Sequence, residues 1–213
     1  MAAAIVAAKR AGVPKDKIEK AIARGQGRSS EGAALESMTV EAMRPPSIAL
    51  VIEIETDNKL RVLQDLKMIL KQGKTLQSAS KFFFTRVGRV VFEKIGGSID
   101  LDTIMDDAIE AGAEDLETMD NGKVVIWTQP TATIQMCHTI GDKYGLKVLN
   151  SGIVWLANKD TEVKVDSESW LPDFIDMLEA LREYPDVQAV YANISRGAMS
   201  DEEWTRIAES LDT

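Results

Sequence analysis

Cysteine, histidine and aromatic residues are scarce in this chain of 213 residues. The single cysteine, Cys137, excludes an internal disulfide framework and fits a reducing compartment. The single histidine, His138, excludes most histidine-rich metal sites. No apolar run approaches the roughly 20 residues that a bilayer-spanning helix needs, so we expect no membrane insertion. The remaining composition is that of an ordinary globular protein.

Motifs for catalysis are also missing. The sequence contains neither a GxxxxGK[ST] phosphate loop nor a GxGxxG turn. Cys137 and His138 are neighbours on a predicted helix, where their side chains point about 100° apart and cannot pair as nucleophile and base. The carboxylates between Asp100 and Asp115 lack the spacing of an EF-hand loop, and we interpret them as a solvated face. We therefore expect a protein that is not an enzyme and that carries no cofactor and no metal.

Charge is distributed unevenly along the chain, which has a net charge of −9. Residues 1–28 carry seven basic and two acidic side chains, a net charge of +5. Residues 29–87 have a net charge of +1 and residues 88–213 a net charge of −15. Such segregation suits a polyanion as the partner of the basic end. The candidate nucleic-acid-binding residues are Lys9, Arg10, Lys15, Lys17, Lys20, Arg24 and Arg28.

These basic residues lie on two predicted helices. The first covers residues 2–11 and is stopped by Gly12. The second has Pro14 in its first turn, runs to about Arg24 and is closed by Gly25. The spacing of Ile18, Ala21 and Ile22 predicts one buried stripe. The spacing of Lys17, Lys20 and Arg24 predicts a solvent-facing stripe, and the composition of residues 25–34 is typical of a flexible linker.

The region after the linker predicts alternating strands and helices. A hairpin of 37–43 and 48–55 is followed by a helix over 59–72, then by the strands SASKFFFTR and RVVFE, with a turn near Gly88. The run Phe82–Phe84 could stack on nucleic-acid bases, but its alternation favours packing in the core.

A complete βαββαβ pattern begins near residue 88, which is the order of a ferredoxin-like unit. It comprises a strand at 89–94, a helix at 102–111, two strands joined by Asn121-Gly122, a helix at 131–144 and a strand at 153–157. The helix of 169–184 and the strand of 186–194 lack partners of their own. We therefore expect residues 88–163 to be an insertion, and 35–87 to pack with 164–213. Ser200 and Glu203 predict a capping box on a last helix.

Several segments of the chain resemble the YebC/PmpR-type family, whose eukaryotic members include the mitochondrial translational activator of cytochrome c oxidase. They are AAKRAGVPKDKIEKAIARGQG, VIEIETDNKLRVLQDLKMILKQGK, VGRVVFE, DTIMDDAIEAGAEDLE and FIDMLEALREYPDVQAVYANI. The resemblance implies an α+β protein of three domains: a small helical N-terminal domain and two ferredoxin-like α+β domains, the third inserted in the second. The corresponding ranges are 1–34, 35–87 with 164–213, and 88–163. The family's usual longer basic start is absent, so we expect the first domain to be N-terminally incomplete.

The resemblance also implies a function. We expect a non-enzymatic translation factor that associates with the ribosome, with ribosomal RNA or with messenger RNA, and that activates organellar translation. The alternative is a DNA-binding transcriptional regulator. A third possibility is a structural protein–protein adaptor that uses the acidic domain as its interaction surface. The expected location is the mitochondrial matrix, or the bacterial cytoplasm in the alternative, and the expected state is a monomer.

Overall fold

The computed structural model describes residues 2–29, 33–94, 100–119 and 122–212. They form two compact units. Unit 1 comprises residues 1–80, 164–192 and 196–211, and unit 2 comprises residues 81–163 with two short C-terminal pieces. Both units combine helices with antiparallel sheets, which confirms the predicted α+β class.

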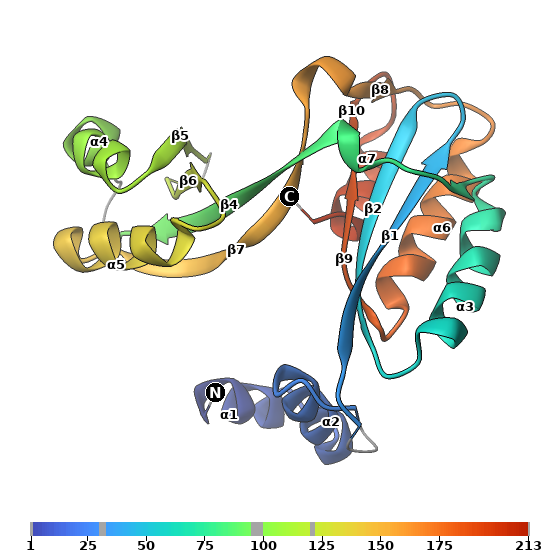
Figure 1. The fold of residues 1–213 in the computed structure, drawn as a ribbon, viewed down its shortest axis with the longest axis horizontal. Coiled ribbons are helices and arrows are strands. Elements are labelled where there is room, and N and C mark those ends of the chain that lie inside the picture. Colours follow the sequence, from blue (N-terminus) through green and yellow to red (C-terminus); the bar gives the residue numbers. More distant parts are fainter. Residues whose placement is uncertain (1, 30–32, 95–99, 120–121, 213) are drawn as a thin grey trace. The chain divides into compact units, whose positions relative to one another are not determined.

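Unit 1 contains a helical pair and a four-stranded sheet of order β3-β1-β2-β9. The neighbouring strands are antiparallel, and Figure 1 shows α3 and α6 side by side along one face of the sheet. The last helix, α7, completes the C-terminal part of unit 1. The short strands β8 and β10 pair in a separate two-stranded sheet. The elements of unit 1 are α1 (Ala2–Arg10), α2 (Lys15–Gly25), β1 (Glu36–Arg44), β2 (Ile48–Thr56), α3 (Lys59–Gln72), β3 (Leu76–Gln77), α6 (Leu171–Glu183), β9 (Val187–Ala192) and α7 (Asp201–Ser210). The two short paired strands are β8 (Val163–Val165) and β10 (Ile194–Arg196).

The central strand β2 is buried on both of its faces. Leu50, Val51 and Ile52 are fully inaccessible, and β1 and β9 pair with the two edges of the strand. Two segments more than 130 residues apart, β2 and β9, therefore share one sheet. The hairpin of β1 and β2 turns at residues 45–47, where Pro45 and Pro46 cannot donate ladder hydrogen bonds. The predicted capping box of α7 is confirmed, since Glu203 N donates to Ser200 Oγ at 3.2 Å and Ser200 N donates to Glu203 Oε2 at 2.9 Å.

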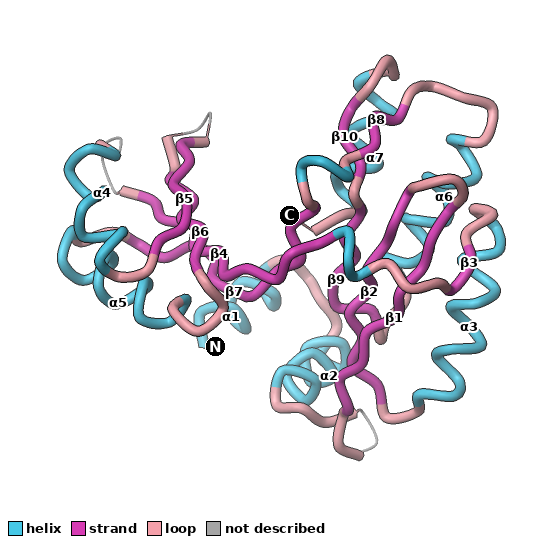
Figure 2. Tube along the Cα trace, turned by 45° about the horizontal axis from the view of Figure 1, so that its top comes forward, coloured by secondary structure: helices cyan, strands magenta, loops and turns pink. Residues whose placement is uncertain are grey.

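Unit 2 has the predicted β-α-β-β-α-β order. Its sheet has the order β5-β6-β4-β7 with every neighbouring pair antiparallel. Figure 2 shows α4 and α5 on the same face of this sheet, and buried Phe92, Ile126 and Met136 lie in the core between the layers. Asn121 of the predicted hairpin turn lies outside the described residues, and Gly122 has a φ of +74°. The elements are β4 (Phe84–Glu93), α4 (Leu101–Glu110), β5 (Ala113–Thr118), β6 (Val124–Thr128), α5 (Thr133–Tyr144) and β7 (Lys147–Ala157).

The expected turn near Gly88 is wrong. Strand β4 runs unbroken from Phe84 to Glu93 and crosses the expected boundary at 87/88, whereas the two units separate after Ser80. The division of the chain into 1–34, 35–87 with 164–213, and 88–163 stays a prediction. The structure has two compact units, and α1 and α2 belong to the same unit as the four-stranded sheet.

The phenylalanine run behaves differently from a regular strand. Residues 81–83 form a 3-10 turn, so the alternation expected over Phe82–Phe84 does not apply. Phe84 is buried in β4, whereas Phe82 is 66% exposed with its ring centroid 4.3 Å from that of Phe83. Packing in the core is therefore correct for Phe84 and wrong for Phe82.

Gly88 is required by a close approach between elements. A Cβ at this position would lie 2.0 Å from Thr133 Oγ1 and 2.3 Å from Thr128 Oγ1, and both threonines are buried. We predict that Gly88→Ala lowers the free energy of unfolding by about 1–3 kcal/mol, the usual cost of overpacking. Denaturant unfolding followed by circular dichroism measures the change.

Gly152 on the neighbouring strand β7 offers a matched control. A Cβ at Gly152 would meet no atom within 4 Å, and Gly152 pairs with Arg89 in the same sheet. Gly152→Ala should therefore leave the stability within about 0.5 kcal/mol. Equal effects of the two substitutions would contradict the close approach at Gly88.

Candidate nucleic-acid interface

Helices α1 and α2 present the predicted basic residues. Six of the seven are exposed: Lys9, Arg10, Lys15, Lys17, Lys20 and Arg28. Lys15 forms an exposed ion pair with Glu19 at 3.5 Å. Within the described residues, Lys17 and Lys20 form no ion pair. Their charges are therefore available to an external anion.

Arg24 differs from this expectation. Its side chain is only 29% exposed, because it reaches from α2 to the ends of strands in the sheet. Its Nη2 atom donates to the carbonyl oxygen of Glu55 at 2.8 Å and to Asp186 Oδ1 at 3.0 Å. The predicted solvent-facing stripe of three cations is therefore wrong at Arg24, whose charge is neutralised inside unit 1.

Asp186 collects three donors from separate parts of unit 1. The residue is 7% exposed and lies directly before β9. Besides the bond from Arg24, Asp186 Oδ2 accepts from Arg61 Nη2 at 3.0 Å and from Thr56 Oγ1 at 2.9 Å. Burial alone would raise the pKa of Asp186, but the hydrogen bonds from Arg24, Thr56 and Arg61 outweigh it and hold the pKa below its usual value. The carboxylate stays ionised and fixes α2 against the sheet.

The two described ends of the glycine-rich segment after α2 are hydrogen-bonded to each other. Leu35 N donates to the carbonyl oxygen of Gly27 at 2.9 Å, and Ser29 N donates to that of Ala33 at 2.7 Å. Arg28 and Ala34 form a β-bridge. The expected flexible linker is therefore closed by hydrogen bonds across its described ends, and residues 30–32 lie outside the described residues.

A polar pocket of about 340 Å³ lies beside these contacts. Its lining joins cations from α2 and α3. Arg61 is not predicted from the sequence as a residue of this pocket. Arg61 lies in the first turn of α3, where its backbone N donates to the side chain of the N-cap residue Asn58 at 3.1 Å. Arg61 comes near Lys20 only through the packing of α2 and α3 in unit 1, which no local sequence pattern reveals. The lining residues are Lys20, Arg24, Ser29, Leu35, Asp57, Arg61, Pro185 and Asp186.

The predicted apolar stripe of α2 is covered only in part. Ile18 is 8% exposed, Ile22 is half-buried and Ala21 is exposed. These residues line an open groove of about 330 Å³ together with Ile5, Ala8 and Val13. Helix α1 contributes Ile5 and Ala8 to this groove. The two short helices together do not cover the apolar stripe of α2 fully.

The residues considered for chemistry lie on α5 in unit 2. His138 is exposed, and its Nδ1 lies 3.6 Å from Asp142 Oδ2 across one helical turn. Cys137 is half-buried and packs against the core of unit 2. Among the residues that the structure describes, no three His, Cys, Asp or Glu side chains converge as a metal ion would require, and no helix has the length and apolar character of a membrane span.

The fold and these exposed lysines define an α+β protein with a basic helical pair. The sequence pattern of the TACO1/YebC second and third domain matches residues 35–194. The chain belongs to the TACO1/YebC family. A relative from Syntrophotalea carbinolica is 34% identical over 207 residues, covering 96% of this chain and 79% of the relative. A relative from Tolumonas auensis is 32% identical over 203 residues, with coverages of 94% and 77%.

Both relatives carry the name "probable transcriptional regulatory protein". A third relative with this name, from Halothermothrix orenii, is 32% identical over 193 residues, covering 89% of this chain and 74% of the relative. The crystal structure of a conserved hypothetical protein from Aquifex aeolicus has a similar fold. Its TM-score is 0.66 at 27% identity, and the match covers 89% of this chain and 76% of that one.

Replacing Asp186 should destabilise unit 1. We predict that Asp186→Asn lowers the free energy of unfolding by about 2–3 kcal/mol at pH 7, because Arg24 and Arg61 lose their shared counter-charge in a largely buried position. Denaturant unfolding measures the loss. Asp176→Asn is the control: it removes a carboxylate that is 68% exposed and paired with Arg206, and it should cost less than about 1 kcal/mol.

Acid should abolish the same contribution. Because the folded pKa of Asp186 lies below its unfolded value, its stabilisation is present above the unfolded pKa of about 3.9 and is lost as the pH falls through the folded value. The difference in unfolding free energy between the wild-type protein and Asp186→Asn should therefore shrink steadily below about pH 4. A difference that stays constant down to about pH 2 would show that the charge of Asp186 is not what stabilises unit 1.

Proposed function

We propose that this chain is a non-enzymatic, nucleic-acid-binding regulatory protein. The observation that supports this most directly is the exposure of Lys17 and Lys20 on α2, without ion-pair partners among the described residues, in a chain of net charge −9. An acidic protein that keeps unpaired lysines on one helical pair has a surface suited to phosphates. Such contacts position a nucleic acid without reading its bases.

The names of the relatives favour DNA as the partner. They are called probable transcriptional regulatory proteins. This name supports the DNA-binding transcriptional regulator, which is the alternative expectation from the sequence, more than the translation factor. The relatives are also bacterial, so the bacterial cytoplasm has support that the mitochondrial matrix lacks. We therefore propose transcriptional regulation through DNA, by a protein that acts as a monomer.

Translation is a second candidate because of the charge distribution. Residues 88–213 have a net charge of −15 and would be repelled by a long duplex lying along them. A compact factor that meets ribosomal or messenger RNA only through its basic helical pair avoids this repulsion. Sedimentation through a sucrose gradient with ribosomal subunits, at low and high salt, separates the two candidates. Non-specific phosphate contacts are lost at high salt, so co-sedimentation that persists there favours translation.

Reversing two charges on α2 tests the basic surface. We predict that Lys17→Glu with Lys20→Glu weakens binding to a DNA duplex of about 30 base pairs and to ribosomal RNA, because both side chains are exposed and have no structural role among the described contacts. The slope of log affinity against log salt should fall by roughly 0.7–0.9 for each phosphate that the variant no longer neutralises. Fluorescence anisotropy at several salt concentrations measures both quantities.

Lys159→Glu with Lys164→Glu provides the matched control. Both residues are exposed and lie outside the helical pair, and the substitution changes the net charge by the same amount. Its salt slope should equal that of the wild-type protein. If the two double variants bind alike, the lysines of α2 are only a solvated face.

A further inference from the structure

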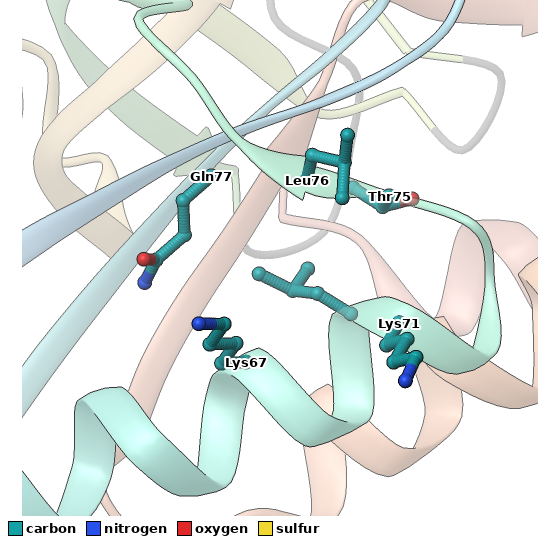
Figure 3. A pocket seen from close by; sticks show the side chains of 6 residues that line it. Lys67, Lys71, Thr75, Leu76 and Gln77 are labelled. Carbon is teal, nitrogen blue, oxygen red and sulfur yellow. The ribbon is translucent and has the colours of Figure 1, made fainter.

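A pocket of about 540 Å³ lies in unit 1 between helix α3 and the edge strand β3. Its size is within the range of small-ligand sites in proteins. Its lining includes Leu70, which is 1% exposed, and Leu76, which is 63% exposed. Figure 3 shows the Gln77 side chain extending from β3 towards the ammonium end of Lys67 on α3. The pocket therefore combines an apolar surface with an amide and an ammonium group.

Lysines without counter-charges surround this pocket. Residues 59–77 carry five basic side chains and one acidic side chain, a net charge of +4. Lys59 and Arg61 are neutralised by Glu36 and Asp186, and Asp65 accepts a hydrogen bond from Tyr184 Oη at 2.6 Å. That leaves Lys67, Lys71 and Lys74, all exposed and without an ion pair in the part of the chain that the structure describes.

We propose that this pocket binds one unpaired nucleotide of a nucleic acid. Lys67, whose ammonium end faces Gln77, holds the phosphate, and Lys71, one helical turn further along α3, adds a second positive charge nearby. The amide of Gln77 offers a donor and an acceptor to the edge of the base, and the exposed side chain of Leu76 contacts its apolar face. The proposal rests on the proposed nucleic-acid-binding function and adds to it a contact that a paired base cannot make.

An acidic peptide would be the other occupant with matching charge. A peptide that adds to a sheet edge gains its affinity from main-chain hydrogen bonds along that edge. Strand β3 has only two residues, and such short edges are poor templates for a further strand. The partly apolar pocket beside the edge suits a flat base better than an extended chain.

The test uses the full chain labelled with ¹⁵N and titrated with adenosine monophosphate, with ribose 5-phosphate as the probe that lacks a base. We expect amide shifts at Leu76, Gln77 and the last turns of α3. Lys67→Gln with Lys71→Gln should raise the dissociation constant for adenosine monophosphate by roughly ten-fold or more, because the variant cannot form charge-assisted bonds to the phosphate.

Gln77→Ala separates a base site from an anion site. It should weaken the binding of adenosine monophosphate several-fold and leave the binding of ribose 5-phosphate unchanged. Lys159→Gln with Lys164→Gln is the matched control for charge and should bind adenosine monophosphate as the wild-type protein does. Circular dichroism checks that each variant is folded.

Three outcomes would overturn the proposal: no shifts at the pocket, equal affinities for the two probes, or stronger binding of a glutamate-rich peptide at the same residues. The outcome is separate from that of the proposed function. The variant Lys17→Glu with Lys20→Glu tests only whether the helical pair α1 and α2 binds a DNA duplex or ribosomal RNA. Adenosine monophosphate can bind the pocket whether or not that prediction holds.

Discussion

The arrangement of unit 1 depends on one buried carboxylate. Asp186 accepts hydrogen bonds from Arg24 of α2, from Arg61 of α3 and from Thr56 at the end of β2. These donors come from parts of the chain up to 162 residues away from Asp186, so the interaction closes the fold rather than a local turn. A carboxylate with fewer donors would not offset its removal from water in this position. The same contact removes Arg24 from the surface and leaves the lysines of α2 as the charges that face solvent.

In unit 1, three arginines form ion pairs, whereas Lys17, Lys20, Lys67, Lys71 and Lys74 form none among the described residues. Arg24, Arg61 and Arg206 form ion pairs through their guanidinium groups, with Arg206 joining Asp176 and Glu179. The planar guanidinium suits such paired positions, whereas an ammonium group is a compact and strongly hydrated charge. The exposed lysines of α2 and those beside α3 all belong to unit 1. Residues 81–163 of unit 2 carry eight basic and thirteen acidic side chains, a net charge of −5. Both surfaces proposed to meet a polyanion thus lie on the unit that repels it less.

The features that the sequence predicts correctly are those with local causes. The capping box of α7, the hairpin around Pro45 and Pro46 and the β-α-β-β-α-β order follow from spacing within a few residues.

The features that the sequence does not predict have distant causes. Arg24 shares a helical face with Lys17 and Lys20, but its partner is Asp186, which no periodicity on α2 reveals. Gly88 interrupts an apolar run and so predicts a turn, whereas the glycine is needed where β4 approaches Thr133 of α5. Arg61 carries no local signal of a site, because the pocket that it shares with Lys20 exists only in the folded protein.

The two proposed contacts make different demands on a nucleic acid. The lysines of α2 can neutralise phosphates on any strand, and their affinity has no dependence on the pairing of the bases. The pocket beside β3 requires a base that is free of its complement, because Gln77 contacts its edge and Leu76 its face in the proposed complex. A duplex satisfies the first demand alone, and binding there must be weaker and more sensitive to salt. A strand with an unpaired base satisfies both, and the apolar contact with Leu76 persists at high salt. Binding that survives salt thus marks an unpaired region, which is abundant in folded RNA and arises in DNA only where the duplex is opened.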